Sequence, residues 1–164
     1  MTPLILYGEL TMANIEAFLY KLQEHVITFG NDSEINIYVN SEGGEVRASQ
    51  LLAHYFNNSP LKIKLIALEY ISSSALFLFI EFNGKKEILS NTWGLLHLGS
   101  SIVETRELRN QKSLDSFRKK VANSEDLHLL NKLSNRGLEP GKLKDLKAGR
   151  DVLLTEEELR KLVT

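Results

Sequence analysis

The stretch INIYVNSEGGEV (residues 35–46) joins an alternating apolar run to a glycine pair and then to a helical pattern. Ile35, Ile37 and Val39 alternate with polar residues, which predicts a strand. The two glycines allow a tight turn whose backbone N–H groups can face a bound atom. A Gly-Gly turn before a helix is more often a plain structural turn than a binding loop. The stretch therefore predicts a strand–turn–helix unit whose function depends on what lies beside it.

Similar units lie on both sides of this stretch. Short apolar runs bounded by polar turns predict strands, and apolar residues at three- and four-residue steps predict amphipathic helices. Strands and helices that alternate at short intervals are typical of an α/β fold, with βαβ units around a mainly parallel sheet. The predicted elements are strands at residues 4–6, 35–40, 62–68, 86–89 and 93–98, helices at 15–26 and 46–56, and an apolar run at 75–80 after a polar break, YISSS.

The second half of the chain is more polar. From Glu104 to Asn135 a thin apolar stripe recurs at helical spacing, which predicts a helical arm that projects and buries its stripe against a partner. Gly137 to Gly149 is predicted to be a loop or an irregular helix. VLL (residues 152–154) is predicted to be the last strand, and the TEEE after it is a capping box that starts a terminal helix. The stripe consists of Leu108, Leu114, Phe117, Val121 and Leu127.

The composition is that of one ordinary globular domain, residues 1–164. The formal net charge of -1 gives no reason to expect nucleic acid or an anionic membrane as a partner. The chain has no cysteine, which excludes thiolate catalysis and cysteine-ligated metal sites. The longest apolar run, Ala75–Ile80, is far shorter than the roughly 20 residues that span a bilayer, and MTPLILYGELT lacks the features of a secretory leader. We therefore expect a cytoplasmic protein.

Three serines stand between a predicted strand and an apolar helix in ALEYISSSALFLF (Ala67–Phe79). A serine at such a junction is well placed as a nucleophile, because the amide N–H groups that follow it and the helix dipole point at developing negative charge. Serines at this position also commonly just cap the helix. His97 ends the apolar run WGLLHL and is a candidate general base, whereas His25, His54 and His128 fall within helical patterns and are interpreted as helix-face residues.

Together these segments resemble the proteolytic subunit of the Clp-type (caseinolytic) serine peptidases, a family that shares its fold with the crotonases. LILYGELTMANIEAFLYKLQ is similar to that family's first strand and helix, and NSEGGEV to its N-S-P-G-G turn, with Glu42 in place of proline. YISSSALFLF is similar to the segment around the nucleophile, with Glu69 where a glycine is expected. GLLHLGSS is similar to the strand that ends in the catalytic histidine. The resemblance runs from Leu4 to the C-terminus and implies a Clp/crotonase-type fold.

The resemblance implies a Ser-His pair and an oxyanion hole. Counting from Asn40 without a gap makes Ser73 the nucleophile, with His97 as its base, whereas counting back from His97 selects Ser72, which stays an alternative. The backbone N–H groups of Gly44 and Ser74 are then the expected oxyanion donors.

The third member of the family's triad is an aspartate ahead of the last strand and helix, a region that GRDVLLTEEEL resembles. Alignment on VLLTEEE puts Arg150 at the position of that aspartate and Asp151 one step later. Asp151 is therefore the predicted acid, and Asp145 or an incomplete triad are the alternatives.

The function that the resemblance implies is a serine-type endopeptidase that acts on short peptides or unfolded proteins without a metal or cofactor. It also implies self-association into rings or higher oligomers through the arm, and a possible ATPase partner. Two other functions stay open. One is a catalytically inactive Clp-like homologue that serves as an assembly or binding scaffold, which Glu69 and the displaced aspartate favour. The other is a crotonase-like acyl-CoA enzyme, which the serine–histidine order and the short chain disfavour.

Overall fold

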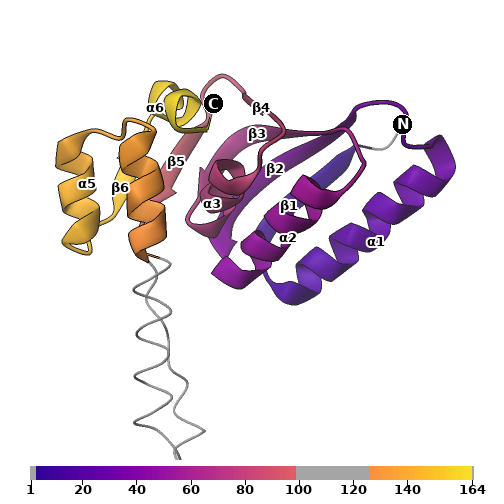
Figure 1. The fold of residues 1–164 in the computed structure, drawn as a ribbon, viewed down its shortest axis with the longest axis horizontal. Helices are drawn as coiled ribbons and strands as arrows, with labels where there is room; N and C mark the ends of the chain where they lie inside the picture. Colours follow the sequence, from indigo (N-terminus) through magenta and orange to yellow (C-terminus); the bar gives the residue numbers. More distant parts are fainter. Residues whose placement is uncertain (1–2, 99–125, 164) are drawn as a thin grey trace, which may run out of the picture.

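Six strands form one sheet in the computed structural model, which describes residues 3–98 and 126–163 (Figure 1). The strand order is β1-β2-β3-β5-β6, and β4 pairs with the first half of β3 while β5 pairs with its second half. All pairs are parallel except β5 with β6. The predicted α/β fold with a mainly parallel sheet is therefore confirmed. The strands are β1 (Leu4–Leu10), β2 (Ile35–Gly44), β3 (Ile63–Ser72), β4 (Lys85–Ile88), β5 (Trp93–Leu96) and β6 (Val152–Leu154).

Helix α1 has a capping group at each end. The Thr11 side chain accepts a hydrogen bond from the Asn14 N–H at the start of α1, and Gly30 ends that helix with a φ of 78°. A further helix has its described part at residues 126–135. The remainder of the predicted arm, residues 104–125, lies outside the described residues. The bounded helices are α1 (Met12–Phe29), α2 (Val46–Asn58), α3 (Ser74–Glu81), α5 (Pro140–Lys147) and α6 (Glu156–Val163).

Helices α1, α2 and α3 lie along one side of the sheet (Figure 1). The strands alternate accordingly, as β1 shows: Leu4 and Leu6 are buried, whereas Ile5 and Tyr7 are 46% and 70% exposed on the other side. Helix α3 has no polar face, because every residue from Ser74 to Ile80 is buried. This helix is therefore the centre of the apolar core, and both of its ends must be satisfied by other parts of the chain.

Two sequence predictions were wrong in detail. The predicted polar break after residue 68 is strand, because β3 continues to Ser72. The pairing register shifts there, since Val39 pairs with Ala67 but Ser41 pairs with Ile71, and the extra residues of β3 hide its alternation. The stretch from residue 137 to 149, predicted as a loop or irregular helix, contains α5, which starts with a proline in its first turn.

The last strand and helix are confirmed as predicted. The Thr155 hydroxyl accepts a hydrogen bond from the Glu158 N–H at 3.4 Å, and the Glu158 carboxylate accepts one from the Thr155 N–H at 2.8 Å, which is a complete capping box. Strand β6 runs antiparallel to β5 with Leu96 opposite Val152. The residue after β5 and the residue before β6 therefore become neighbours, and this brings the C-terminal part of the chain to the site described next.

Candidate active site

Ser73 occupies a strained turn between β3 and α3. Its φ and ψ are 52° and −125°, a conformation that costs a residue with a side chain about 1–3 kcal/mol. The backbone is held on both sides, because the Ser73 N–H donates to Leu95 O at 2.7 Å and the Ser73 carbonyl accepts from the Phe77 N–H at 3.1 Å. A sharp strand-to-helix turn of this kind exposes the serine hydroxyl at the end of a sheet.

The Ser73 hydroxyl lies 2.8 Å from His97 Nε2, within hydrogen-bond range. Sheet pairing explains the contact, because Ser72 is opposite Leu95 in the parallel β3–β5 pair. Ser73 and His97 each directly follow the carboxyl end of one of these two strands. Ser72, the alternative nucleophile, is only 5% exposed within β3. Of the two registers left open by the sequence, the structure thus pairs His97 with Ser73.

Asp151 comes close to the other nitrogen of the same histidine. Its Oδ1 lies 3.8 Å from His97 Nδ1, beyond hydrogen-bond range, and the two side chains are 66% and 42% exposed. The antiparallel pairing of Leu96 with Val152 accounts for this approach. Such contacts are often long without substrate and tighten in the reacting complex. The Asp151 carboxylate is therefore near His97 but not hydrogen-bonded to it.

Asp145, the alternative acid, is engaged elsewhere. Its carboxylate accepts a hydrogen bond from Arg150 Nη1 at 2.8 Å, and its backbone carbonyl accepts one from the Arg150 N–H at 3.0 Å. Arg150, which the alignment puts at the position of the aspartate, therefore points to Asp145. The acid that the structure brings to His97 is Asp151.

The glycine pair packs beside the serine turn. A Cβ added to Gly43 would lie 2.7 Å from Ser73 Cβ and 2.9 Å from Ser74 N, whereas one added to Gly44 would lie 2.6 Å from Leu10 O. Gly43 is thus the glycine in direct contact with the serine turn. Ser74 begins α3, where a backbone N–H has no partner inside the helix. The assignment of Gly44 and Ser74 as oxyanion donors stays a prediction.

Two polar residues of the turn have structural roles that the sequence did not reveal. Ser41 Oγ donates to Gly8 O at 2.6 Å and accepts from the Gly43 N–H at 3.0 Å, which fixes the glycine turn. Asn40 Oδ1 accepts a hydrogen bond from the Tyr70 N–H at 3.1 Å, where the register shift leaves that N–H free. The sequence signal that could have indicated these hydrogen bonds is the polar pair Asn40-Ser41 at the end of an alternating apolar run.

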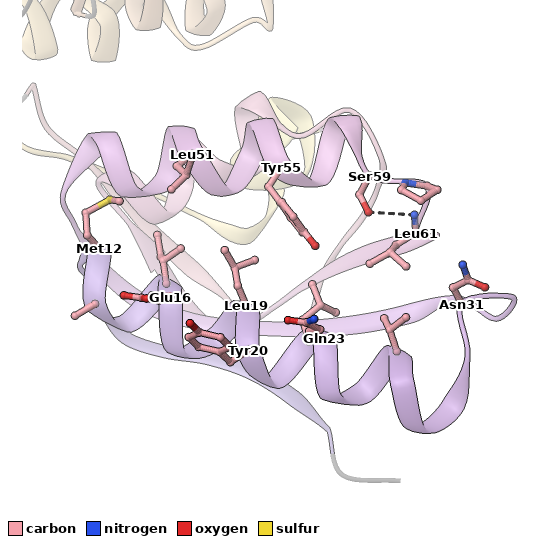
Figure 2. Close-up of a pocket in the computed structure, with 15 residues that line it drawn as sticks. Met12, Glu16, Leu19, Tyr20, Gln23, Asn31, Leu51, Tyr55, Ser59 and Leu61 are labelled. Atoms are coloured by element: carbon pink, nitrogen blue, oxygen red, sulfur yellow. Dashed lines mark hydrogen bonds between the residues drawn. The ribbon is translucent and has the colours of Figure 1, made fainter.

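A hollow lies away from Ser73, between α1 and α2 (Figure 2). It has a volume of about 870 Å³ and a mainly apolar lining, and Figure 2 shows Leu51 and Tyr55 of α2 facing Leu19 of α1. Glu16 is its one charged lining residue. The hollow therefore contains no pairing of a nucleophile with a base, and we place the candidate chemistry at Ser73.

Within residues 3–98 and 126–163, no group of three His, Asp or Glu side chains is placed to hold a metal ion, and no helix is long and apolar enough to cross a membrane. No family model matches the chain, and no curated protein matches it.

Proposed function

We propose that the protein is a serine peptidase with a Clp/crotonase-type fold that hydrolyses peptide bonds in short or unfolded chains. The observation that carries this proposal is the 2.8 Å separation of Ser73 Oγ and His97 Nε2 at a strained strand-to-helix turn. A nucleophile within hydrogen-bond reach of a base, with the base approached by an acid, is the arrangement that acyl transfer requires.

In this proposal Ser73 Oγ attacks the carbonyl carbon of the scissile peptide while its proton passes to His97 Nε2. The tetrahedral intermediate collapses as the same proton is delivered to the leaving amine. Water then attacks the acyl-enzyme while its proton passes to His97, and that proton returns to Ser73 Oγ as the acid product leaves. The N–H groups of Gly44 and Ser74 stabilise the oxyanion, helped by the N-terminal end of α3. Asp151 stabilises the charged imidazole through Nδ1.

A serine-reactive fluorophosphonate probe tests this proposal directly. The wild-type chain should be labelled at one residue, and Ser73→Ala should abolish both labelling and hydrolysis of a fluorogenic peptide. Ser72→Ala should stay labelled. Absence of labelling in a folded wild-type chain would contradict the peptidase function.

The proposal extends to self-association into rings or higher oligomers, with an ATPase as a partner and the cytoplasm as the compartment. The support for association is the apolar stripe of residues 104–135, of which Leu127 lies in the described part and is 58% exposed. Light scattering at micromolar concentration should give a mass of several chains. A strictly monomeric mass would contradict this part of the proposal.

One observation favours a second candidate, an inactive homologue that acts as an assembly or binding scaffold. The 3.8 Å gap between Asp151 and His97, at an exposed position, leaves the triad unclosed. Under this candidate the chain still associates but the probe does not label Ser73, so the same experiment separates the two functions.

A further inference from the structure

Two aromatic side chains stack on the side of the sheet opposite to α1, α2 and α3, the helices described on its other side. Tyr70 of β3 is paired with Trp93 of β5, and their rings lie 5.4 Å apart at an angle of 24°. The next residue on each strand faces the core: Ile71 is fully buried, and a Cβ on Gly94 would touch the Leu159 side chain. The stack therefore faces away from the core, and Trp93 is 45% exposed. It forms a flat aromatic surface open to solvent.

This aromatic surface lies beside the candidate nucleophile. Tyr70 precedes Ser73 by three residues of extended chain, roughly 10 Å at about 3.3 Å per residue. Leu95, which accepts the Ser73 N–H bond, follows Trp93 by two residues on the same strand. A peptide held with its scissile bond at Ser73 could therefore place a side chain two or three residues away on this surface.

Two exposed carboxylates flank the stack. Glu42 lies on the same side of the sheet as Tyr70, because each is one residue from the paired positions Ser41 and Ile71, and it directly precedes Gly43, which contacts the serine turn. Glu69 is the neighbour of Tyr70 in the chain. Burial raises the pKa of the Tyr70 hydroxyl, and the charge of Glu42, nearby Tyr7 and Glu69 raise it further. Tyr70 is therefore a neutral ring in negative surroundings.

These two glutamates are the positions at which the turn and the nucleophile segment depart from the family pattern, and the structure brings them to the same ring. Two carboxylates alone would not define a binding site. The exposed aromatic stack adds a flat face, and a guanidinium or ammonium group binds well where a π face and a carboxylate meet.

We infer, resting on the proposed peptidase function, that Glu42, Glu69, Tyr70 and Trp93 form a subsite for a lysine or arginine side chain of the substrate peptide. Glu42 and Glu69 attract the cation and Trp93 stacks on it. The preferred substrates are then peptides that carry a basic residue close to the scissile bond.

Trp93 is the only tryptophan of the chain and reports on this subsite directly. The full-length Ser73→Ala variant would be titrated with an arginine-containing peptide and with the same peptide carrying glutamine instead, while tryptophan emission is followed. We expect a change in Trp93 emission and about tenfold tighter binding of the arginine peptide. The double variant Glu42→Gln/Glu69→Gln, made in the same background, should bind both peptides within about twofold. Glu24→Gln, an exposed carboxylate on α1, is the matched control and should keep the preference.

The outcomes separate this inference from the peptidase function. If the wild-type chain is labelled at Ser73 but the two peptides bind equally, the subsite is wrong and the peptidase stands. If the arginine peptide is preferred in a chain that no probe labels, the subsite stands as part of a peptide-binding scaffold and the peptidase is wrong. A preference that survives in Glu42→Gln/Glu69→Gln would overturn the assignment of these glutamates.

Discussion

The two ends of α3 differ in how their free backbone groups are satisfied. At the C-terminal end, the carbonyls of Phe79 and Phe82 accept hydrogen bonds from Lys86 Nζ at 3.3 and 2.9 Å. The carbonyl of Ile80 accepts another from Arg136 at 3.2 Å. Two cations thus compensate the negative end of the helix dipole, as a buried helix requires.

The N-terminal end of the same helix is left without a side-chain cap. Ser73 stands at the capping position, but its hydroxyl is directed to His97 and makes no capping hydrogen bond. The first N–H groups and the positive end of the dipole are then available to a ligand. This core helix is therefore closed by side chains at its C-terminal end and open at its N-terminal end, where the proposed mechanism needs an anion to bind.

The largest expected effect is at the open end. Ser73→Ala should lower turnover about 10⁶-fold, because the nucleophile is lost, while the melting temperature stays nearly unchanged. Ser72→Ala is the control, since Ser72 is buried in β3 and should retain turnover. Loss of turnover in Ser72→Ala alone would show that the other serine is the nucleophile.

Asp151→Asn should lower turnover about 10²–10⁴-fold, because a histidine that acts as a base needs an acceptor on its second nitrogen. Stability should change little, since the Asp151 side chain is 66% exposed. Asp145→Asn removes an acid of the neighbouring helix α5 and should leave turnover within about twofold. Unchanged turnover in Asp151→Asn would mean that the site works with two residues.

Gly43→Ala should damage both stability and probe labelling. The added Cβ would lie 2.9 Å from Ser74 N and 2.7 Å from Ser72 O, at a φ of +97°, and we expect a loss of about 2–4 kcal/mol. Gly137→Ala is a matched control, because its φ is +81° but no atom lies within 4 Å of the new Cβ. It should cost only about 1 kcal/mol. If Gly43→Ala and Gly137→Ala lost the same free energy of unfolding in urea, the close contact of Gly43 with the serine turn would have no effect on stability.

The smallest effect concerns the closed end. Burial, and then the charges of Arg136 and Lys132, lower the pKa of Lys86 from 10.5 to about 8. Between these two values the unfolded chain binds more protons than the native one, so the free energy of unfolding should rise as the pH rises from about 8 to about 10.5. Because Lys86 is half-buried, we expect a rise of only about 1–2 kcal/mol.

Lys86→Met should lack this rise, whereas Lys85→Met, which changes a 74%-exposed lysine on the same strand, should keep it. Urea unfolding at pH 7.5 and pH 10 measures the difference. The same pH dependence in wild type and Lys86→Met would mean that the closed end is fully solvated.

The sequence predicted most of the strands and helices because their apolar periods are local. The capping box at Thr155 and the end of α1 at Gly30 also follow from neighbouring residues alone. The Ser73–His97 pair was predictable only from the order of segments, since the periodicity does not show that β3 and β5 are adjacent.

Three features could not be predicted from local sequence patterns because they depend on distant pairing, and only the family resemblance led us to expect one of them, the approach of Asp151 to His97. The continuation of β3 to Ser72 depends on a register shift against β2. The approach of Asp151 to His97 depends on an antiparallel contact between strands far apart in the chain. The contact of Gly43, and not Gly44, with the serine turn depends on how two loops meet at the sheet edge.

The positive φ of Ser73 has a consequence for how this protein can evolve. Glycine adopts a φ of 52° without penalty, so Ser73→Gly would raise the stability of the fold by about 1 kcal/mol. In a lineage that no longer used the hydroxyl, mutation and selection for folding would both favour that replacement. Ser73 therefore keeps a backbone strain that glycine would relieve, and the proposed use of its hydroxyl as a nucleophile gives that strain a function.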